Sequence, residues 1–216
     1  MKLPVFSGQS IIRRVPFTIV MLVVIAAVGL TTATHVDRLR PSLLQRFGFA
    51  PFHLGLDHLR TGDLVRLLTS VFLTLGGWLF YWSLAMIAVC VGLAEKRVGT
   101  WRTMLTFWGI HLATLLIQSL LLAIPAPRLD LLWLNLLQTE HDVGPSAGYY
   151  GCLGLVCQKQ SEPSRHRLLA IIGGILLARL IWAALAPHDR HSPLAADMAH
   201  LIAFPLGVAL AKRLRG

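Results

Sequence analysis

The chain has 216 residues, of which 55% are hydrophobic and only 14% are charged, and its formal net charge is +10. Soluble domains usually carry about 25% charged residues, so this composition excludes an ordinary soluble protein. The basic excess could suggest nucleic acid, but the basic residues are segregated between long apolar segments, and we expect no nucleic-acid partner.

The first apolar segment covers residues 15–34 and contains no charged residue. It follows Arg13 and Arg14 and ends in small residues, which is also the pattern of a signal peptide. We favour a membrane span, because removing this segment would leave five spans and upset the alternation of charge described below. One domain is enough for a chain of this length.

Further apolar segments follow along the whole chain. A helix needs about 20 residues to cross the hydrocarbon core of a bilayer. We expect spans near residues 15–34, 76–95, 103–125, 146–160, 168–187 and 196–211. Charged or histidine side chains well inside these segments are few: His111, Arg179 and His200. The sequence therefore predicts an all-α, polytopic membrane protein that forms a single six-helix bundle.

Charge alternates between the two ends of the expected spans. The two termini and every second connection hold 12 of the 20 basic residues: Lys2, Arg13, Arg14, Lys96, Arg97, Arg102, Lys159, Arg165, Arg167, Lys212, Arg213 and Arg215. Beside them lie only two of the ten acidic residues, Glu95 and Glu162. Basic residues accumulate on the cytoplasmic side of membrane proteins. We therefore expect a multi-pass protein of a cell membrane, a bacterial inner membrane in particular, with both termini cytoplasmic.

The fourth expected span is short and begins within GPSAGYYG, residues 144–151. Its length from Ser146 to Lys159 corresponds to roughly 21 Å of helix, against a hydrocarbon core of about 30 Å. Ser146 would then lie below the outer surface, at the N-terminus of a recessed helix. Irregular backbone at that depth is tolerated only inside protein or facing water. The pattern predicts a hydrated cavity with Ser146 at its floor.

His200 is the second candidate for chemistry, because ionisable residues inside membrane spans are functional candidates. In a Ser146–His200 pair, the histidine would take the serine proton, the serine would attack a carbonyl, and the histidine would return the proton to the leaving amine. The alternative is a packed, hydrogen-bonded His200 and a Ser146 that only caps its helix. Both interpretations stay open on the residues alone.

Four motifs occur in order along residues 60–213: GDLVRLLTSVFLTLGGWL (62–79), GLAEKRVGTW (92–101), GPSAGYYG (144–151) and AHLIAFPLG (199–207). In this order they resemble the rhomboid family of intramembrane serine proteases. The resemblance implies hydrolysis of a peptide bond in or near a substrate's transmembrane helix, with no cofactor and no metal. The implied partners are transmembrane protein substrates and the lipid bilayer.

The resemblance also implies roles for matching residues. Ser146 would be the nucleophile and His200 the general base and acid, while Tyr150 would stack on the histidine and orient it. Arg66 and Glu95 would be structural, organising the first loop and the cytoplasmic end of the second span. Three glycines would permit close packing of loop and helices: Gly144, Gly151 and Gly207.

The second span departs from the family's pattern. Counting back from Glu95, the family's oxyanion-holding histidine and asparagine fall at Leu79 and Ser83. Leucine donates no hydrogen bond, and a serine has a single hydroxyl donor. The loss of one oxyanion donor typically slows a reaction about 10²–10³-fold. Two functions therefore remain: a Ser–His peptidase with Ser83 as a tentative oxyanion donor, and a weak or inactive rhomboid-like protein that binds transmembrane helices.

Arg179 lies in the middle of the fifth span, where a cation needs a partner or water, and the sequence names no partner. His188 and His191 could bind a metal, but without a third fixed ligand we expect no metal site. A small transporter would show paired interrupted helices and internal symmetry, and the sequence shows neither.

Overall fold

The computed structural model describes four ranges of the chain: residues 15–48, 63–123, 143–185 and 194–213. Regular structure in these ranges is helical, apart from one isolated bridge between Arg38 and Gly76. The prediction of an all-α fold is confirmed. His188 and His191 lie outside the described residues.

Each of the six expected spans corresponds to a helical stretch. The helices are α2 (Pro16–Thr31), α5 (Trp78–Met86), α6 (Gly92–Val98), α7 (Thr100–Ala123), α9 (Ser146–Gln158), α10 (Ser164–Leu185) and α11 (Leu194–Arg213). A π-helical segment, η4 (Ile87–Val91), joins α5 to α6. Shorter helices precede α5: α3 (Pro41–Phe47), α4 (Asp63–Thr69) and the 3₁₀ turn η3 (Ser70–Phe72).

Within the described ranges, four helical stretches are long and apolar enough to cross a membrane: Trp78–Val98, Thr100–Leu121, Ser164–Leu185 and Leu194–Arg213. The apolar helix α2 has 16 residues and α9 has 13. The chain is therefore a multi-pass membrane protein, as predicted. Because only four crossings among the described residues meet the criterion of length and composition, the number of six spans stays a prediction.

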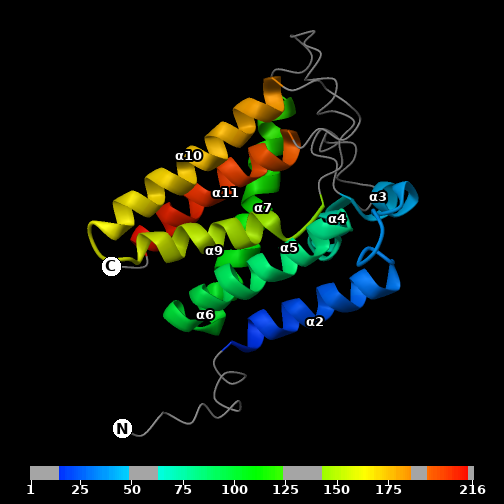
Figure 1. Ribbon diagram of the computed structural model, residues 1–216, viewed down its shortest axis with the longest axis horizontal. Helices are drawn as coiled ribbons and strands as arrows, with labels where there is room; N and C mark the ends of the chain where they lie inside the picture. Colours follow the sequence, from blue (N-terminus) through cyan, green and yellow to red (C-terminus); the bar gives the residue numbers. More distant parts are fainter. Residues whose placement is uncertain (1–14, 49–62, 124–142, 186–193, 214–216) are drawn as a thin grey trace, which may run out of the picture.

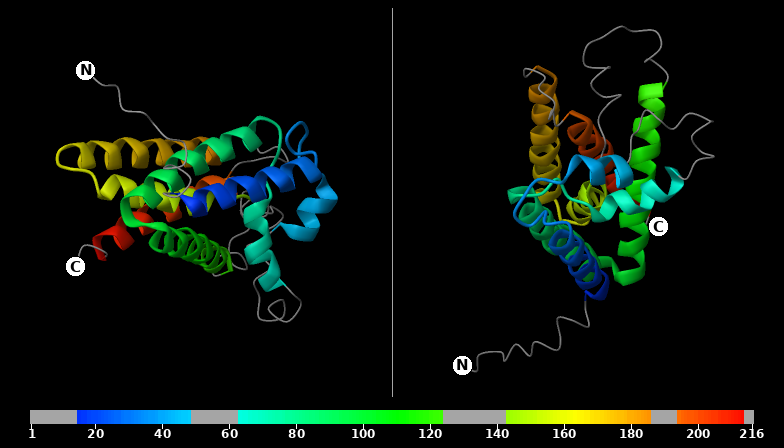
Figure 2. Two further views of the ribbon diagram at one scale, coloured as in Figure 1. Left: turned by 90° about the horizontal axis from the view of Figure 1, so that it is seen from below. Right: turned by 90° about the vertical axis from the view of Figure 1, so that its right-hand side faces the viewer.

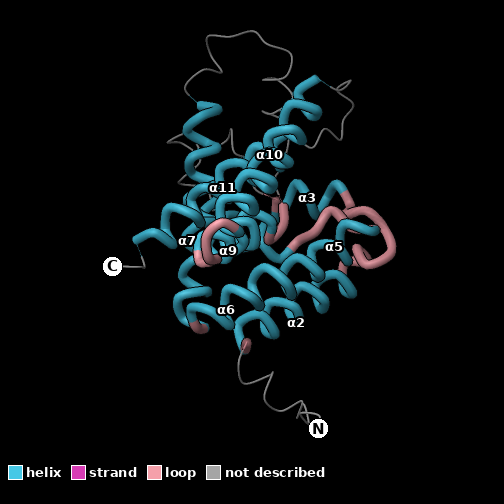
Figure 3. Tube along the Cα trace, turned by 60° about the vertical axis from the view of Figure 1, so that its left-hand side comes forward, coloured by secondary structure: helices cyan, strands magenta, loops and turns pink. Residues whose placement is uncertain are grey.

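Helix α9 lies at the centre of the bundle (Figure 3). It packs most extensively on α11 and also contacts α7, η4, α6 and α10. On one side, α2 lies alongside α5 and α6 (Figure 2), and α10 lies on the opposite side, against α11 (Figure 1). Apart from Ser146 and Leu153, every residue of α9 is buried. The start of this helix is thus placed by contacts on all sides.

Glu95 fixes one edge of the bundle by capping the N-terminus of α2. Its carboxylate oxygens accept hydrogen bonds from the backbone N–H groups of Phe17 and Thr18, both at 2.9 Å, and from the Thr18 hydroxyl at 2.7 Å. The first N–H groups of a helix have no partner within the helix, and a buried carboxylate needs hydrogen bonds. Glu95, only 2% exposed, meets both needs at once, which is the structural role implied by the resemblance.

Two side chains link their own helix to a neighbouring helix through a hydrogen bond to a backbone carbonyl oxygen. Arg97 on α6 donates to the carbonyl oxygen of Val156 at 3.2 Å, near the C-terminus of α9, where a cation also complements the helix dipole. On α7, Nε2 of His111 lies 3.1 Å from the carbonyl oxygen of Leu67 in α4. His111 is thus held as a packed side chain between α7 and α4.

Candidate active site

Ser146 is the first residue of α9, and Pro145 occupies the N-cap position. No side-chain hydrogen bond caps this helix, so the interpretation of Ser146 as a simple N-cap is wrong. Ser146 is also half-buried, whereas the residues that follow it are buried. The hydroxyl has no hydrogen-bond partner among the described residues, and it lies at a helix start, where unpaired N–H groups and the helix dipole favour negative charge.

The loop before Ser146 is held by its backbone. Gly144 has φ of +119°, a conformation that only glycine adopts readily. Its N–H donates to the carbonyl oxygen of Ser70 in η3 at 2.8 Å. Because η3 follows α4, this bond ties the entrance of α9 to the segment just before α5. A side chain at residue 144 would strain the turn that presents Ser146.

His200 lies in the second turn of α11 and is buried, with 7% of its surface exposed. The ring of Tyr150 stacks against it, with 4.4 Å between ring centroids and 37° between ring planes. Tyr150 follows Ser146 by one turn of α9, which is about 6 Å along the helix axis. The structure thus brings Tyr150 and His200 together, at the depth of the turn that follows Ser146.

Both ring nitrogens of His200 are buried and make no hydrogen bond within the described part of the chain. A Ser146–His200 hydrogen bond is therefore not formed in this structure. The interpretation of His200 as a packed, hydrogen-bonded histidine stays open, because its Nδ1 lies 3.5 Å from a carboxylate oxygen of Asp197. Catalytic hydrogen bonds often are long without substrate and tighten in the complex, and Nε2 has no partner among the described residues that would compete with such a bond.

Glycines set the distance between α9 and α11. A Cβ atom added at Gly207 would overlap the backbone carbonyl of Gly151, and one added at Gly154 would overlap that of Phe204. Backbone atoms cannot move aside as a side-chain tip can. Small residues at a crossing allow membrane helices to approach to backbone contact. The crossing of the helices that carry Ser146 and His200 therefore depends on the absence of side chains at these positions.

The sequence analysis did not identify one residue that lies next to His200, Asp197 on α11. An oxygen of its carboxylate lies 2.7 Å from the guanidinium of Arg179 on α10, and the same oxygen lies 3.5 Å from Nδ1 of His200. Asp197 is 2% exposed. The partner that Arg179 needs is thus Asp197. The signal in the sequence was its spacing of three residues from His200, which puts both on one face of a helix.

Ser83 and Leu79 lie on α5, whereas α9 packs on the π-helical segment η4 that follows. A π turn adds one residue to the helix, and one residue corresponds to about 100° of rotation. Counting back from Glu95 along a regular α-helix therefore does not identify the face on which Ser83 lies. Ser83 is half-buried, and its hydroxyl makes no hydrogen bond to any described residue.

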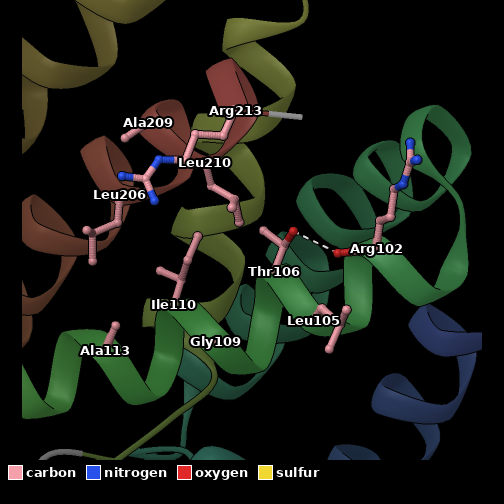
Figure 4. A pocket seen from close by; sticks show the side chains of 10 residues that line it. All are labelled: Arg102, Leu105, Thr106, Gly109, Ile110, Ala113, Leu206, Ala209, Leu210 and Arg213. Atoms are coloured by element: carbon pink, nitrogen blue, oxygen red, sulfur yellow. Dashed lines mark hydrogen bonds between the residues drawn. The ribbon is translucent and has the colours of Figure 1, made fainter. Parts of the chain in front are cut away.

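A groove of about 480 Å³ lies elsewhere, between α7 and α11 (Figure 4). Its lining is mostly apolar and includes two arginines, Arg102 and Arg213, and the side chain of Arg213 extends back toward Leu206. Neither Ser146 nor His200 lines it. The groove is therefore separate from the candidate active site.

In a comparison with known families, residues 61–215 match the model of the family described as Rhomboid domain. This range covers well over half of the chain and contains Ser146, Tyr150, Asp197 and His200. Comparison with curated proteins and with solved structures gives no match.

Proposed function

Because the chain belongs to the rhomboid family, and is thus an intramembrane protease or a related protein, we propose that it hydrolyses a peptide bond in or near a substrate's transmembrane helix. Ser146 is the nucleophile and His200 is the general base and acid. The observation that carries this proposal is the stack of Tyr150 on a buried His200 whose Nε2 has no hydrogen-bond partner among the described residues.

The proposed reaction has two halves. In the first, a ring nitrogen of His200 takes the Ser146 proton as the hydroxyl oxygen bonds to the substrate carbonyl carbon, and the proton then passes to the leaving amine as the C–N bond breaks. In the second, His200 takes a proton from water, which attacks the acyl-enzyme and releases the new carboxyl end. Ser146 recovers its proton, and no other reactant is needed.

The developing oxyanion needs hydrogen-bond donors. The backbone N–H groups in the first turn of α9, including that of Ser146, supply them, and the dipole of a buried helix strengthens their effect. Leu79 donates nothing, and the hydroxyl of Ser83 lies on a helix outside the main contacts of α9. We therefore propose a slow peptidase that depends on α9 itself more than on side chains of α5.

Water and substrate reach the site from different directions in this proposal. With 13 residues, α9 is about 20 Å long, so Ser146 lies below the surface of a hydrocarbon core of about 30 Å. Water enters from the outer side, and the substrate helix arrives laterally from the bilayer. The helix must unwind to present a carbonyl, so helix-breaking or small residues near the cleavage site favour hydrolysis.

The test is cleavage of a reporter transmembrane helix by the purified protein in liposomes. The wild type cleaves it, whereas Ser146→Ala and His200→Ala do not. Ser164→Ala is the matched control, because Ser164 also begins a long helix, α10, but is exposed and outside the site. Equal cleavage by the wild type and Ser146→Ala contradicts the proposal.

A second candidate function is capture of transmembrane helices without cleavage. It is favoured by the apolar Leu79 at a position where the family has an oxyanion donor. It predicts that the wild type and Ser146→Ala crosslink to the reporter helix equally well and that neither releases a product. Product formation by the wild type alone rules this function out.

We also propose that the protein lies in a bacterial inner membrane with both termini in the cytoplasm. The support is the basic residues at one end of the helices, such as Lys96 and Arg97 in α6 and Lys212 and Arg213 in α11. Reporter domains that fluoresce only in the cytoplasm, fused at Met1 and at Gly216, are expected to be fluorescent at both ends. A dark reporter at either end contradicts this topology.

A further inference from the structure

Four side chains form a continuous row: Arg179 from α10, Asp197 and His200 from α11, and Tyr150 from α9, one turn after Ser146. The contacts along this row are 2.7 Å from Arg179 to Asp197, 3.5 Å from Asp197 to Nδ1 of His200, and 4.4 Å between the rings of His200 and Tyr150. Asp197 and His200 are buried, whereas the Arg179 side chain is about half exposed (49%). The row is therefore charged at its outer end and buried at the end nearest to Ser146.

We propose that Asp197 is a positioning residue that completes a Ser146–His200–Asp197 triad. The carboxylate accepts the Nδ1–H of His200 and thereby leaves Nε2 unprotonated, as the nitrogen that takes the Ser146 proton. The role of this contact in hydrolysis rests on the proposed function, whereas the contact and the tautomer it selects do not. Asp197 takes up no proton in the reaction, and its charge stabilises the imidazolium that forms on His200.

The geometry supports more than an ion pair between helices. A carboxylate that served only Arg179 would have no reason to direct the same oxygen toward an imidazole, yet the Asp197 oxygen nearest to Arg179 is also the one nearest to Nδ1. No other hydrogen-bond partner for Nδ1 occurs among the described residues. The spacing of 3.5 Å is slightly longer than a hydrogen bond, and a small rotation of either side chain closes it.

Arg179 has a supporting part in this arrangement. A buried carboxylate without a partner tends to take up a proton and become neutral, and a protonated Asp197 would no longer favour a proton on Nδ1. The guanidinium of Arg179 supplies that partner at 2.7 Å and so compensates the buried charge of the carboxylate. The cation in the middle of α10 thus acts on His200 through Asp197 and does not touch the reacting atoms.

The first measurement is the tautomer of His200, read from ¹⁵N chemical shifts of the labelled histidine rings in detergent micelles, at a pH where the ring is neutral. The chain has nine histidines, and the spectrum of His200→Ala identifies the relevant signals. The wild type is expected to carry its proton on Nδ1, and Asp197→Asn is expected to lose this preference. A wild-type proton on Nε2, or an unchanged tautomer in Asp197→Asn, overturns the proposal whether or not the protein hydrolyses anything.

The second measurement is hydrolysis of the reporter helix. Asp197→Asn is expected to lower kcat on the order of 10²- to 10⁴-fold, as the wrong histidine tautomer does in serine proteases, with KM nearly unchanged. Asp197→Glu keeps a carboxylate and is expected to recover part of kcat. Glu162→Gln is the matched control, because Glu162 forms an ion pair with Arg165 away from the site, and its kcat is expected to equal that of the wild type.

A purely structural role gives a different pattern. Asp197→Asn and Arg179→Gln would then lower the melting temperature equally, and kcat per folded molecule would stay at the wild-type value, which overturns the proposal. If Asp197→Asn changes the tautomer but the wild type cleaves no substrate, the Asp197–His200 contact stands and the protease function fails. The two proposals are thus tested separately.

Discussion

Two of the helix pairs that α11 forms, with α9 and with α10, differ sharply in how they are built. Against α9 it packs backbone to backbone, because Gly154 and Gly207 carry no side chain at the crossing. Against α10 the contact is looser: only 11% of the α10 span is buried, compared with 50% of the α11 span. Ser146 and His200 lie on the tightly packed pair, and the only ion pair found between α10 and α11 in the described residues is Arg179–Asp197.

The difference suggests a division of tasks. A catalytic pair needs side chains held to within a fraction of an ångström, and close backbone contact between α9 and α11 supplies that rigidity. A substrate helix needs a path from the lipid, and a helix with few buried side chains moves at the lowest cost. The predictions below test this comparison, beginning with the largest expected effect.

The tight pair is expected to break when a methyl group is added at its crossing. Gly207→Ala places a Cβ into the carbonyl of Gly151, and we expect a loss of about 3 kcal/mol in the free energy of unfolding, since overpacking against backbone is hard to relieve. Gly173→Ala in α10 is the matched control, because a Cβ there has open space. Titration with a denaturing detergent measures both, and equal effects of the two substitutions would remove the contrast between the pairs.

The next largest effect is expected at the opposite edge, where Glu95 caps α2. Glu95→Ala removes the acceptor of three hydrogen bonds and leaves buried donors unpaired, so we expect a loss of about 2 kcal/mol in stability. Glu162→Ala breaks only exposed ion pairs with Arg165 and His166 and should change stability by less than about 1 kcal/mol. The same titration with a denaturing detergent measures the loss of stability in both variants. A small loss in Glu95→Ala would show that α2 is held by packing alone.

A smaller effect is expected from the stack on His200. Tyr150→Leu removes the aromatic ring, and such contacts contribute about 1 kcal/mol. This corresponds to a roughly fivefold loss of kcat in reporter cleavage. Tyr150→Phe keeps the ring and should retain most of the wild-type rate. A large loss in Tyr150→Phe would instead assign a role to the phenol hydroxyl.

Local sequence patterns were enough to predict much of this arrangement. Long uncharged segments predicted the helices, and four motifs in order indicated the rhomboid family, which the family match confirms. The residues singled out in the α9 and α11 motifs lie on the two helices that pack most closely. Each of these inferences depends on residues that are near one another in the sequence or on a motif whose order is preserved.

Contacts between distant segments could not be predicted in the same way. The partner of Arg179 is Asp197, on another helix, and Gln118 of α7 donates to the carbonyl oxygen of Ala195 at 2.9 Å. Neither pair has a local signal, because it depends on how the helices rotate against one another. The π turn in η4 had no signal either, and it changes the helix face on which Ser83 lies relative to a regular α-helix.

The most direct measurement of the central claim is labelling with a serine-reactive fluorophosphonate, with the modified peptide located by mass spectrometry. The account predicts that the wild type is labelled on Ser146, that Ser146→Ala is not labelled, and that His200→Ala is labelled about 10²–10⁴-fold more slowly because the general base is missing. An unlabelled wild type, a label that persists in Ser146→Ala, or an unchanged rate in His200→Ala would contradict it.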